Sequence, residues 1–155
     1  LVLTDSATKI IEVETDYRIR DVEALADYVY PPHDFAAPIA SGSHQFDAMA
    51  IIPCSMGTLS AVACGSSDTL ITRAADVCLK EKRRLIMVPR ETPLSLTQIR
   101  NMAAAAEAGA IILPACPAFY SRPKSLNELV DVLVGRVLDL LGVENDLYQR
   151  WKGQA

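Results

Sequence analysis

The sequence predicts an α/β protein in which helices cover both faces of a parallel sheet. Short apolar runs alternate with longer helical segments along the chain, which is the pattern of βαβ units. Half of the residues are apolar and only 6% are aromatic, so the expected core is aliphatic. Polar residues follow each apolar run, and ligands bind at that carboxyl edge in open α/β sheets. These observations indicate one ligand-binding domain over residues 1–155.

Strands are expected where apolar residues continue without interruption, because such runs are typical of strands buried on both faces. The expected strands are residues 1–4 (LVLT, the end of a strand), 48–53 (AMAIIP), 84–88 (RLIMV) and 110–113 (AIIL). Pro89 and Pro114 close the last two. The loops that follow these four strands should converge on one site.

Helices are expected between the strands, where apolar residues recur at helical spacing. The expected helices are residues 6–13, 21–28, 59–63, 69–82, 95–108 and 125–141. Ser95 is a candidate N-cap, and Gly109 and Gly142 stand where helices should stop. Residues 30–38 should form a loop because three prolines interrupt regular structure, and residues 54–58 should form a polar turn.

Composition and cysteine usage exclude several classes of protein. A net charge of −4 argues against nucleic-acid binding, which usually requires a basic face. No apolar run approaches the ~18 residues of a membrane helix. The cysteines contain no CxxC pair, and they are not spaced with the two histidines as zinc ligands. We therefore expect no metal site, no secretory leader, and four reduced, mostly buried thiols in a cytoplasmic protein. The residues are Cys54, Cys64, Cys78, Cys116, His33 and His44.

The polar segment between the second strand and its helix has two interpretations. Ser55, Met56, Gly57 and Thr58 combine hydroxyls, backbone N–H groups and a helix N-terminus, which suits a bound phosphate. The same residues also suit a simple N-cap with a glycine turn. Both interpretations fit the residues.

Cations stand at several places where phosphates bind. Arg73 and Lys80 are seven residues apart and share one helix face, although a solvated face explains them equally well. Arg90 and Glu91 follow a buried strand, where an arginine binds phosphate bidentately and a glutamate transfers a proton. Arg136 interrupts an apolar helix, so it needs an anionic partner or a path to water. In an acidic protein, these four cations suggest bound phosphates.

Several segments closely resemble UbiX-type flavin prenyltransferases. They are residues 54–63 (CSMGTLSAVA), 73–91 (RAADVCLKEKRRLIMVPRE), 112–120 (ILPACPAFY) and 129–142 (LVDVLVGRVLDLLG), with 14–16 (ETD) near the start. The resemblance covers almost the whole chain and implies a doubly wound, Rossmann-like sheet in three αβα layers. It also implies transfer of a dimethylallyl group from dimethylallyl monophosphate to N5 and C6 of reduced FMN. The product, prenylated FMN, serves UbiD-type decarboxylases, which act in ubiquinone biosynthesis among other places.

The resemblance also implies roles for individual residues. Glu91 falls on the acid/base carboxylate of the family. The FMN-binding positions are Thr4 (usually a serine in the family), Ser55, Met56, Gly57, Thr58 and Arg73. The positions that bind the prenyl phosphate are Lys80, Arg90, Tyr120 and Arg136, and the positions that line the pocket are Trp151 and Glu14. The family forms large homo-oligomers, commonly dodecamers, with sites at subunit interfaces.

The chemistry agrees with these roles. Ionising an allylic phosphate requires stabilisation of both the departing phosphate and the allylic cation. Lys80, Arg90 and Arg136 suit the phosphate, and Tyr120 and Trp151 suit the cation through cation–π contact. No DDxxD motif is present, so we expect a monophosphate bound by cations without a metal ion.

One departure from the family and two alternative functions complete the interpretation. The family opens with a strand and a Gly-Ala-Ser-Gly turn that binds the flavin phosphate, and we expect this βα unit, about 30 residues, to be missing here. A flavin-dependent cysteine decarboxylase is one alternative, but its catalytic histidine and Pro-Ala-Met-Asn motif have no counterpart, since residues 114–117 read PACP. The other alternative is a non-catalytic flavin-binding or chaperone-like homologue.

Overall fold

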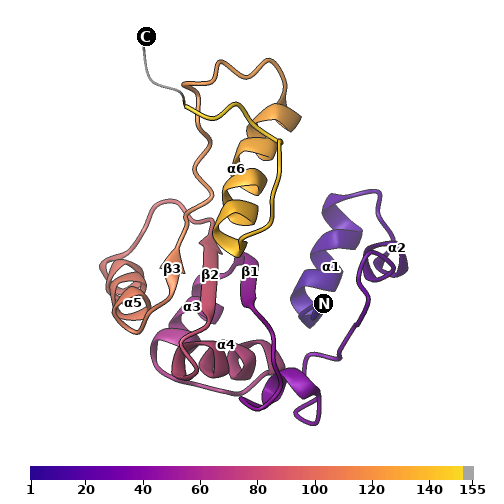
Figure 1. The fold of residues 1–155 in the computed structure, drawn as a ribbon, viewed down its shortest axis with the longest axis vertical. Coiled ribbons are helices and arrows are strands. Elements are labelled where there is room, and N and C mark those ends of the chain that lie inside the picture. The colour runs from indigo at the N-terminus through magenta and orange to yellow at the C-terminus, as the bar shows by residue number, and fades with distance from the viewer. Residues whose placement is uncertain (152–155) are drawn as a thin grey trace.

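Three apolar runs of the sequence form a parallel sheet in the order β1-β2-β3 (Figure 1). The computed structural model describes residues 1–151. The strands are β1 (Ala48–Cys54), β2 (Arg84–Pro89) and β3 (Ile111–Ile112). Ile86 in β2 is paired with Ala50 of β1 and with Ile111 of β3. The register between β1 and β2 shifts after Ile51, beside Pro53, which has no N–H group for the ladder.

Helices precede and follow these strands along the chain. They are α1 (Asp5–Glu14), α2 (Ile19–Glu23), the short 3-10 helix η1 (Pro38–Ala40), α3 (Met56–Ala63), α4 (Leu70–Lys80), α5 (Leu96–Glu107) and α6 (Leu126–Leu141). Figure 1 shows α1 and α2 to one side of the sheet, beyond β1. The alternation of helices with parallel strands confirms the predicted α/β class.

The two faces of β2 pack against different helices. Leu85 and Met87 join a buried cluster to which α3, α4 and α5 contribute residues such as Leu59, Cys78 and Ala105. Ile86 and Val88 point to the other face, where α6 covers them. The alternation follows from the two-residue period of a strand. The sheet is therefore the middle of the three predicted αβα layers.

Hydroxyl side chains determine where the helices begin. Thr4 Oγ1 accepts from the N–H of Ala7 at 3.0 Å at the start of α1. Ser55 and Ser125 cap α3 and α6 in the same way. Thr69 and Ser95 form capping boxes at the starts of α4 and α5. Residues 4 and 55 thus have a structural role that is independent of any ligand.

Three expectations about the elements were wrong. Met56, Gly57 and Thr58 are the first turn of α3 rather than a separate turn, because Ser55 caps the helix directly after β1. The second helix covers Ile19–Glu23 and not residues 21–28. Residues 1–4 are not a strand of the three-stranded sheet; within residues 1–151 their β pairing is a single parallel bridge between Val2 and Tyr30.

The cysteines divide into two classes. All four are free, as expected, but only Cys54 and Cys78 are buried. Cys64 and Cys116 are exposed, which corrects the expectation of mostly buried thiols. Burial raises the pKa of both Cys54 and Cys78 to about 11. In the part of the chain that the structure describes, no helix is long and apolar enough to cross a membrane.

Candidate functional site

A cavity of about 820 Å³ lies between β1 and α1 and extends to the carboxyl ends of β1 and β2. This volume is within the ~300–1,000 Å³ range of small-molecule sites. Its walls are mostly apolar. The predicted site residues in its lining are Thr4, Ser55, Met56, Thr58, Arg90 and Glu91. Six positions chosen from the sequence thus meet at one cavity, where the topology of a parallel sheet predicts them.

The polar end of this cavity includes the start of α3. The N–H of Thr58 donates to Ser55 Oγ at 3.1 Å, and the two hydroxyl oxygens lie 3.0 Å apart. The N–H groups of Met56 and Gly57 open the helix, where no preceding turn supplies an acceptor. A Cβ atom added to Gly57 would meet only Ser55 Oγ, at 3.9 Å, so the space beside this turn is open. Such a helix start fits a phosphate group, and it is also the simple N-cap of the alternative interpretation.

Arg90 and Glu91 follow β2 at the mouth of the cavity. Both side chains are exposed. Glu91 Oε1 accepts from the N–H of Thr92 at 3.1 Å, which orients the carboxylate. Within residues 1–151, Arg90 forms no salt bridge with a carboxylate of the protein. The pair therefore offers a cation for an anionic group and a carboxylate for proton transfer.

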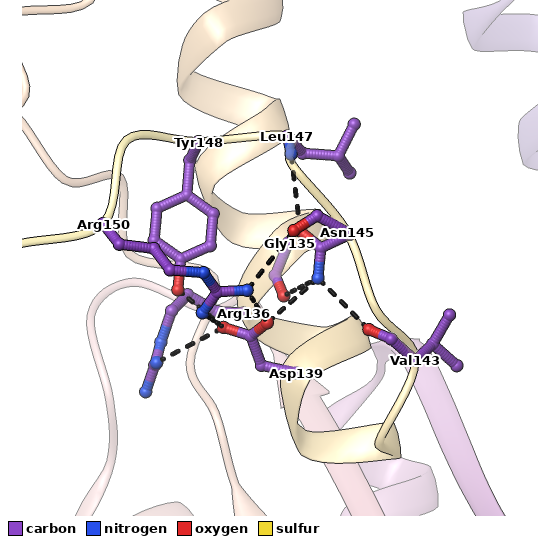
Figure 2. Close-up of polar contacts among 8 residues, drawn as sticks. All are labelled: Gly135, Arg136, Asp139, Val143, Asn145, Leu147, Tyr148 and Arg150. Atoms are coloured by element: carbon purple, nitrogen blue, oxygen red, sulfur yellow. Dashed lines mark hydrogen bonds and ion pairs between the residues drawn. The ribbon is translucent and has the colours of Figure 1, made fainter.

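A second group of polar residues surrounds Asp139 on α6 (Figure 2). Arg150 donates to both oxygens of this carboxylate, at 2.8 and 3.0 Å. The Tyr148 hydroxyl donates to Oδ2 at 2.6 Å, and Asn145 Nδ2 donates to Oδ1 at 2.9 Å. Arg136 Nη1 lies 3.7 Å from Oδ2. Hydrogen bonds from Arg150 and Tyr148 hold the pKa of Asp139 well below its usual range, so the carboxylate is ionised at neutral pH.

This group accounts for the cation that interrupts the apolar sequence of α6. Arg136 has the anionic partner that was expected, and its side chain is 51% exposed. Its neighbours Tyr148 and Asp139 raise the pKa of the Arg136 guanidinium. Tyr120, another predicted phosphate-binding residue, is exposed. The backbone leading to Tyr120 starts at the carboxyl edge of the sheet, where the N–H of Ala115 donates to the carbonyl of Pro89 at 2.9 Å.

The structure does not bring every predicted residue to these two groups. Arg73 donates Nε to the carbonyl of Ala40 at 3.0 Å and pairs with Asp76 at 3.2 Å, outside the cavity lining. Its guanidinium fixes the loop at η1 in this chain. Glu14 and Trp151 are exposed and do not line the cavity. Their predicted roles, like that of Arg73, stay predictions.

Lys80 lies outside the cavity, beside a different hollow. It ends α4 and lines a smaller hollow with Cys64 and Ala108, at the amino edge of the sheet. The length of β2 separates this edge from Glu91, which is ~20 Å for six residues of strand. Within one chain, Lys80 therefore cannot act on a group that is bound beside Glu91.

Sequence reasoning missed the residues around Arg136. None of them was a candidate: Asp139, Asn145, Tyr148 and Arg150. The spacing of three residues between Arg136 and Asp139 was a usable signal, because such pairs share one helix face. No local pattern indicated that residues 143–150 turn back along α6.

Comparison with known proteins identifies the class to which this fold and cavity belong. Residues 1–138 match the family model described as Flavoprotein. The flavin prenyltransferase UbiX of Thermoplasma acidophilum is 53% identical over 151 residues, which are 97% of this chain and 84% of that protein. This chain therefore belongs to the UbiX flavin prenyltransferase family of flavoproteins, as its sequence segments predicted.

Solved structures show the same relationship. The crystal structure of AnUbiX in complex with FMN and dimethylallyl pyrophosphate matches with a TM-score of 0.97 and 49% identity, over 100% of this chain and 82% of that one. A dodecameric, FMN-dependent UbiX-like decarboxylase from Escherichia coli O157:H7 matches with a TM-score of 0.95 and 48% identity, over 99% and 83%. The cysteine decarboxylase TvaF has only 15% identity and a TM-score of 0.58, over 91% and 78%, so that likeness concerns the fold alone.

Proposed function

We propose that this protein is a flavin prenyltransferase, which joins a dimethylallyl group from dimethylallyl monophosphate to N5 and C6 of reduced FMN. One observation carries the proposal: the cavity at the carboxyl edge has a helix start that suits a phosphate and an adjoining Arg90–Glu91 pair. The chain around this cavity is about half identical to proteins named for this activity. The product, prenylated FMN, would pass to a UbiD-type decarboxylase.

The acceptor fits the residues that line the cavity. FMN is a substrate here, with an apolar ring system and a terminal phosphate. We assign its phosphate-bearing end to Ser55 and Thr58, which line the cavity, and to the N–H group of Gly57, which lies between them at the helix start but is not part of the lining. Apolar side chains at the carboxyl end of the cavity, Met56 among them, suit the ring system. Thr4 also lines this cavity, although its hydroxyl already accepts from Ala7.

The transfer requires two kinds of side chain. Breaking the allylic C–O bond leaves an electron pair on the phosphate, and we assign stabilisation of that charge to Arg90 and Arg136. Closing the second bond adds a proton to the allyl double bond and releases the proton of C6, and we assign these two proton transfers to the carboxyl group of Glu91. The aromatic ring of Tyr120 suits the positive allyl group.

We further propose that the complete site forms between copies of this chain in a homo-oligomer. The separation of Lys80 from Glu91 supports this, because a lysine at the amino edge reaches such a site only from a neighbouring chain. Large apolar side chains exposed on several helices support it as well, among them Leu96, Ile99 and Leu126. A dodecameric relative offers a precedent for the assembly.

The experiment supplies the protein with FMN, dithionite and dimethylallyl monophosphate, or the corresponding pyrophosphate, and measures the mass and absorbance of the released flavin. A flavin heavier by one dimethylallyl group supports the proposal. An unchanged flavin together with decarboxylation of a peptide C-terminal cysteine would replace it with the decarboxylase alternative. No reaction in either assay would favour a non-catalytic flavin-binding protein.

Two additions to this assay test the remaining expectations. Activity should survive EDTA, because cations of the protein are proposed to hold the phosphate; strict recovery on adding back a metal ion would contradict this. Mixed oligomers of Lys80→Ala and Glu91→Gln chains should regain about one quarter of the wild-type activity if each site takes these residues from two chains. Free thiols are typical of a reducing compartment, so we expect the reaction to take place in the cytoplasm.

A further inference from the structure

The Asp139 carboxylate contacts two guanidinium groups in unequal ways. Arg150 takes both oxygens in a bidentate pair, and Tyr148 and Asn145 occupy further acceptor positions. Arg136 lies on the same helix, three residues earlier, but its 3.7 Å separation is too long for a hydrogen bond. The Asp139 side chain is only 18% exposed. Its carboxylate therefore accepts hydrogen bonds from residues of the C-terminal segment 143–150 and not from Arg136.

The C-terminal segment packs along α6 and is held there by further hydrogen bonds. Asn145 Nδ2 also donates to the carbonyls of Gly135 and Val143, at 3.3 Å each. Arg150 donates to the carbonyl of Asn145 at 3.3 Å, and its guanidinium lies 5.4 Å from the centre of the Tyr148 ring. Figure 2 shows these side chains converging on the carboxylate from the C-terminal segment.

Removing Arg150 would change the partner of the carboxylate. An arginine and an aspartate three residues apart on a helix attract each other. Without Arg150, each oxygen of the Asp139 carboxylate keeps one donor, Tyr148 or Asn145, and has an acceptor position free. The Arg136 guanidinium would then move closer to the Asp139 carboxylate than the present 3.7 Å and donate its hydrogen bonds to it. In the present arrangement those donors stay available on a half-exposed side chain near Asp139 and Tyr148.

We propose that Arg150 and Asp139 are positioning residues for the prenyl-phosphate site: Arg150 occupies the Asp139 carboxylate and so keeps the Arg136 guanidinium available for the phosphate of the donor. This inference rests on the proposed function, because that function assigns a phosphate to Arg136. It predicts competition between two arginines for one carboxylate. A merely structural contact would show no such competition.

The test measures binding of dimethylallyl monophosphate by calorimetry in the presence of saturating oxidised FMN, so that no turnover is needed. Arg150→Met should raise the Kd about tenfold, which corresponds to the loss of one charge-assisted hydrogen bond. Arg150→Lys, which keeps the charge but not the bidentate pair, should have a smaller effect. Arg100→Met, at an exposed position of α5, is the matched control and should bind as the wild type does.

The decisive variant combines Asp139→Asn with Arg150→Met. An asparagine cannot form the ion pair with Arg136, so the double variant should bind the donor about as tightly as Asp139→Asn alone. Wild-type affinity in Arg150→Met, or a double variant no better than Arg150→Met, would overturn the inference. Donor binding without product in the wild type would contradict the proposed function and leave the positioning role intact. Absence of donor binding in the wild type would overturn both.

Discussion

Tyr148 lies directly against Gly135, on the face of α6 that the C-terminal segment covers. A Cβ atom at Gly135 would come within 2.5 Å of Tyr148 Cδ1 and within 2.9 Å of Asn145 Oδ1. Real side chains do not approach so closely, so glycine is the residue that lets the segment lie flat on the helix. This close packing also brings the Tyr148 hydroxyl to the Asp139 carboxylate, near Arg136.

Gly135→Ala should therefore lift residues 143–150 from α6 while leaving the helix intact. Alanine favours the helix by about 1 kcal/mol over glycine, so a loss of function would not reflect a weaker helix. We expect faster trypsin cleavage after Arg150 and weaker binding of dimethylallyl monophosphate. Asn127→Ala, at an exposed position of the same helix, is the control. Wild-type cleavage and wild-type donor affinity in Gly135→Ala would show that the segment does not support the site.

Glu91→Gln should retain FMN binding and lose prenyl transfer. The amide has the shape of the carboxylate but cannot accept a proton, and general-base catalysis contributes about 10²–10⁴-fold in rate. Single-turnover measurements with reduced FMN and dimethylallyl monophosphate give the rate, and flavin fluorescence gives the affinity. Glu107→Gln, at an exposed position at the end of α5, is the matched control. Unchanged turnover in Glu91→Gln would remove this carboxylate from the mechanism.

Lys80→Ala and Arg136→Ala should each weaken donor binding more than flavin binding. Each change removes a charge-assisted contact with phosphate, which corresponds to about a ten- to hundredfold loss of affinity. Calorimetry with the donor and fluorescence titration with FMN separate the two effects. Lys9→Ala, at an exposed position of α1, is the control for Lys80. An equal loss of FMN affinity would contradict this division of roles.

The strands were the most predictable part of the fold, because their burial on both faces leaves an uninterrupted apolar signal. The expected ranges 48–53 and 84–88 differ from β1 and β2 by one residue at the carboxyl end. The third was less accurate: residues 110–113 were expected and β3 is Ile111–Ile112, although the N–H of Leu113 still donates to Met87 at 2.9 Å. The start of α3 was misplaced because Ser55 can begin either a turn or a helix, and only the cap geometry distinguishes them.

The part of the candidate site that lies at the ends of strands was predictable from the sequence. The part formed by tertiary contacts of the C-terminal segment was not. Ser55, Arg90 and Glu91 meet because their strands are parallel neighbours, which the alternation of elements already indicated. The Asp139 cluster depends on a segment that reverses direction after Gly142, whose left-handed φ of 81° ends α6. The glycine was recognised as a stop signal, but the path beyond it is set by tertiary contacts.

The two buried cysteines should resist alkylation while the two exposed ones react. Burial raises the pKa of the Cys54 and Cys78 thiols to about 11, so both stay protonated and unreactive at pH 8. Cys64 and Cys116 are exposed to the reagent. Intact-mass analysis after iodoacetamide should show two additions to the native protein and four after denaturation. Three or more rapid additions to the native protein would contradict the assigned burial.

The same two thiols make the free energy of unfolding depend on pH. Their pKa is about 11 in the folded protein and near 9 in the unfolded chain. Their contribution to stability is therefore complete below pH 9 and declines as the pH rises toward 11.

The last prediction concerns the edge of β1 that faces away from β2. β1 pairs with β2 on one side, and within residues 1–151 no strand pairs with its other edge. The part of the cavity beside residues 48–52 runs along this edge, between β1 and the bridged residues Val2 and Tyr30, and its walls are apolar, so it could hold one further strand. The part at Ser55 and Glu91, to which FMN is assigned, lies beyond the carboxyl end of β1 and would stay open. An unpaired edge in the middle of an apolar region exposes N–H and C=O groups and invites aggregation.

A strand, a Gly-Ala-Ser-Gly turn and a helix fused ahead of Leu1 should therefore occupy this space. The turn would add backbone N–H groups for the FMN phosphate, each worth about 1.5–3 kcal/mol as a charged hydrogen bond, so FMN affinity should rise at least tenfold. The 155-residue chain alone should be poorly soluble or bind FMN weakly. A matched extension with valine in place of both glycines tests whether the turn or the strand is responsible: it should restore solubility without the full gain in affinity. A stable, flavin-saturated oligomer of the 155-residue chain would contradict the prediction, and FMN would then be held by the start of α3 without the turn.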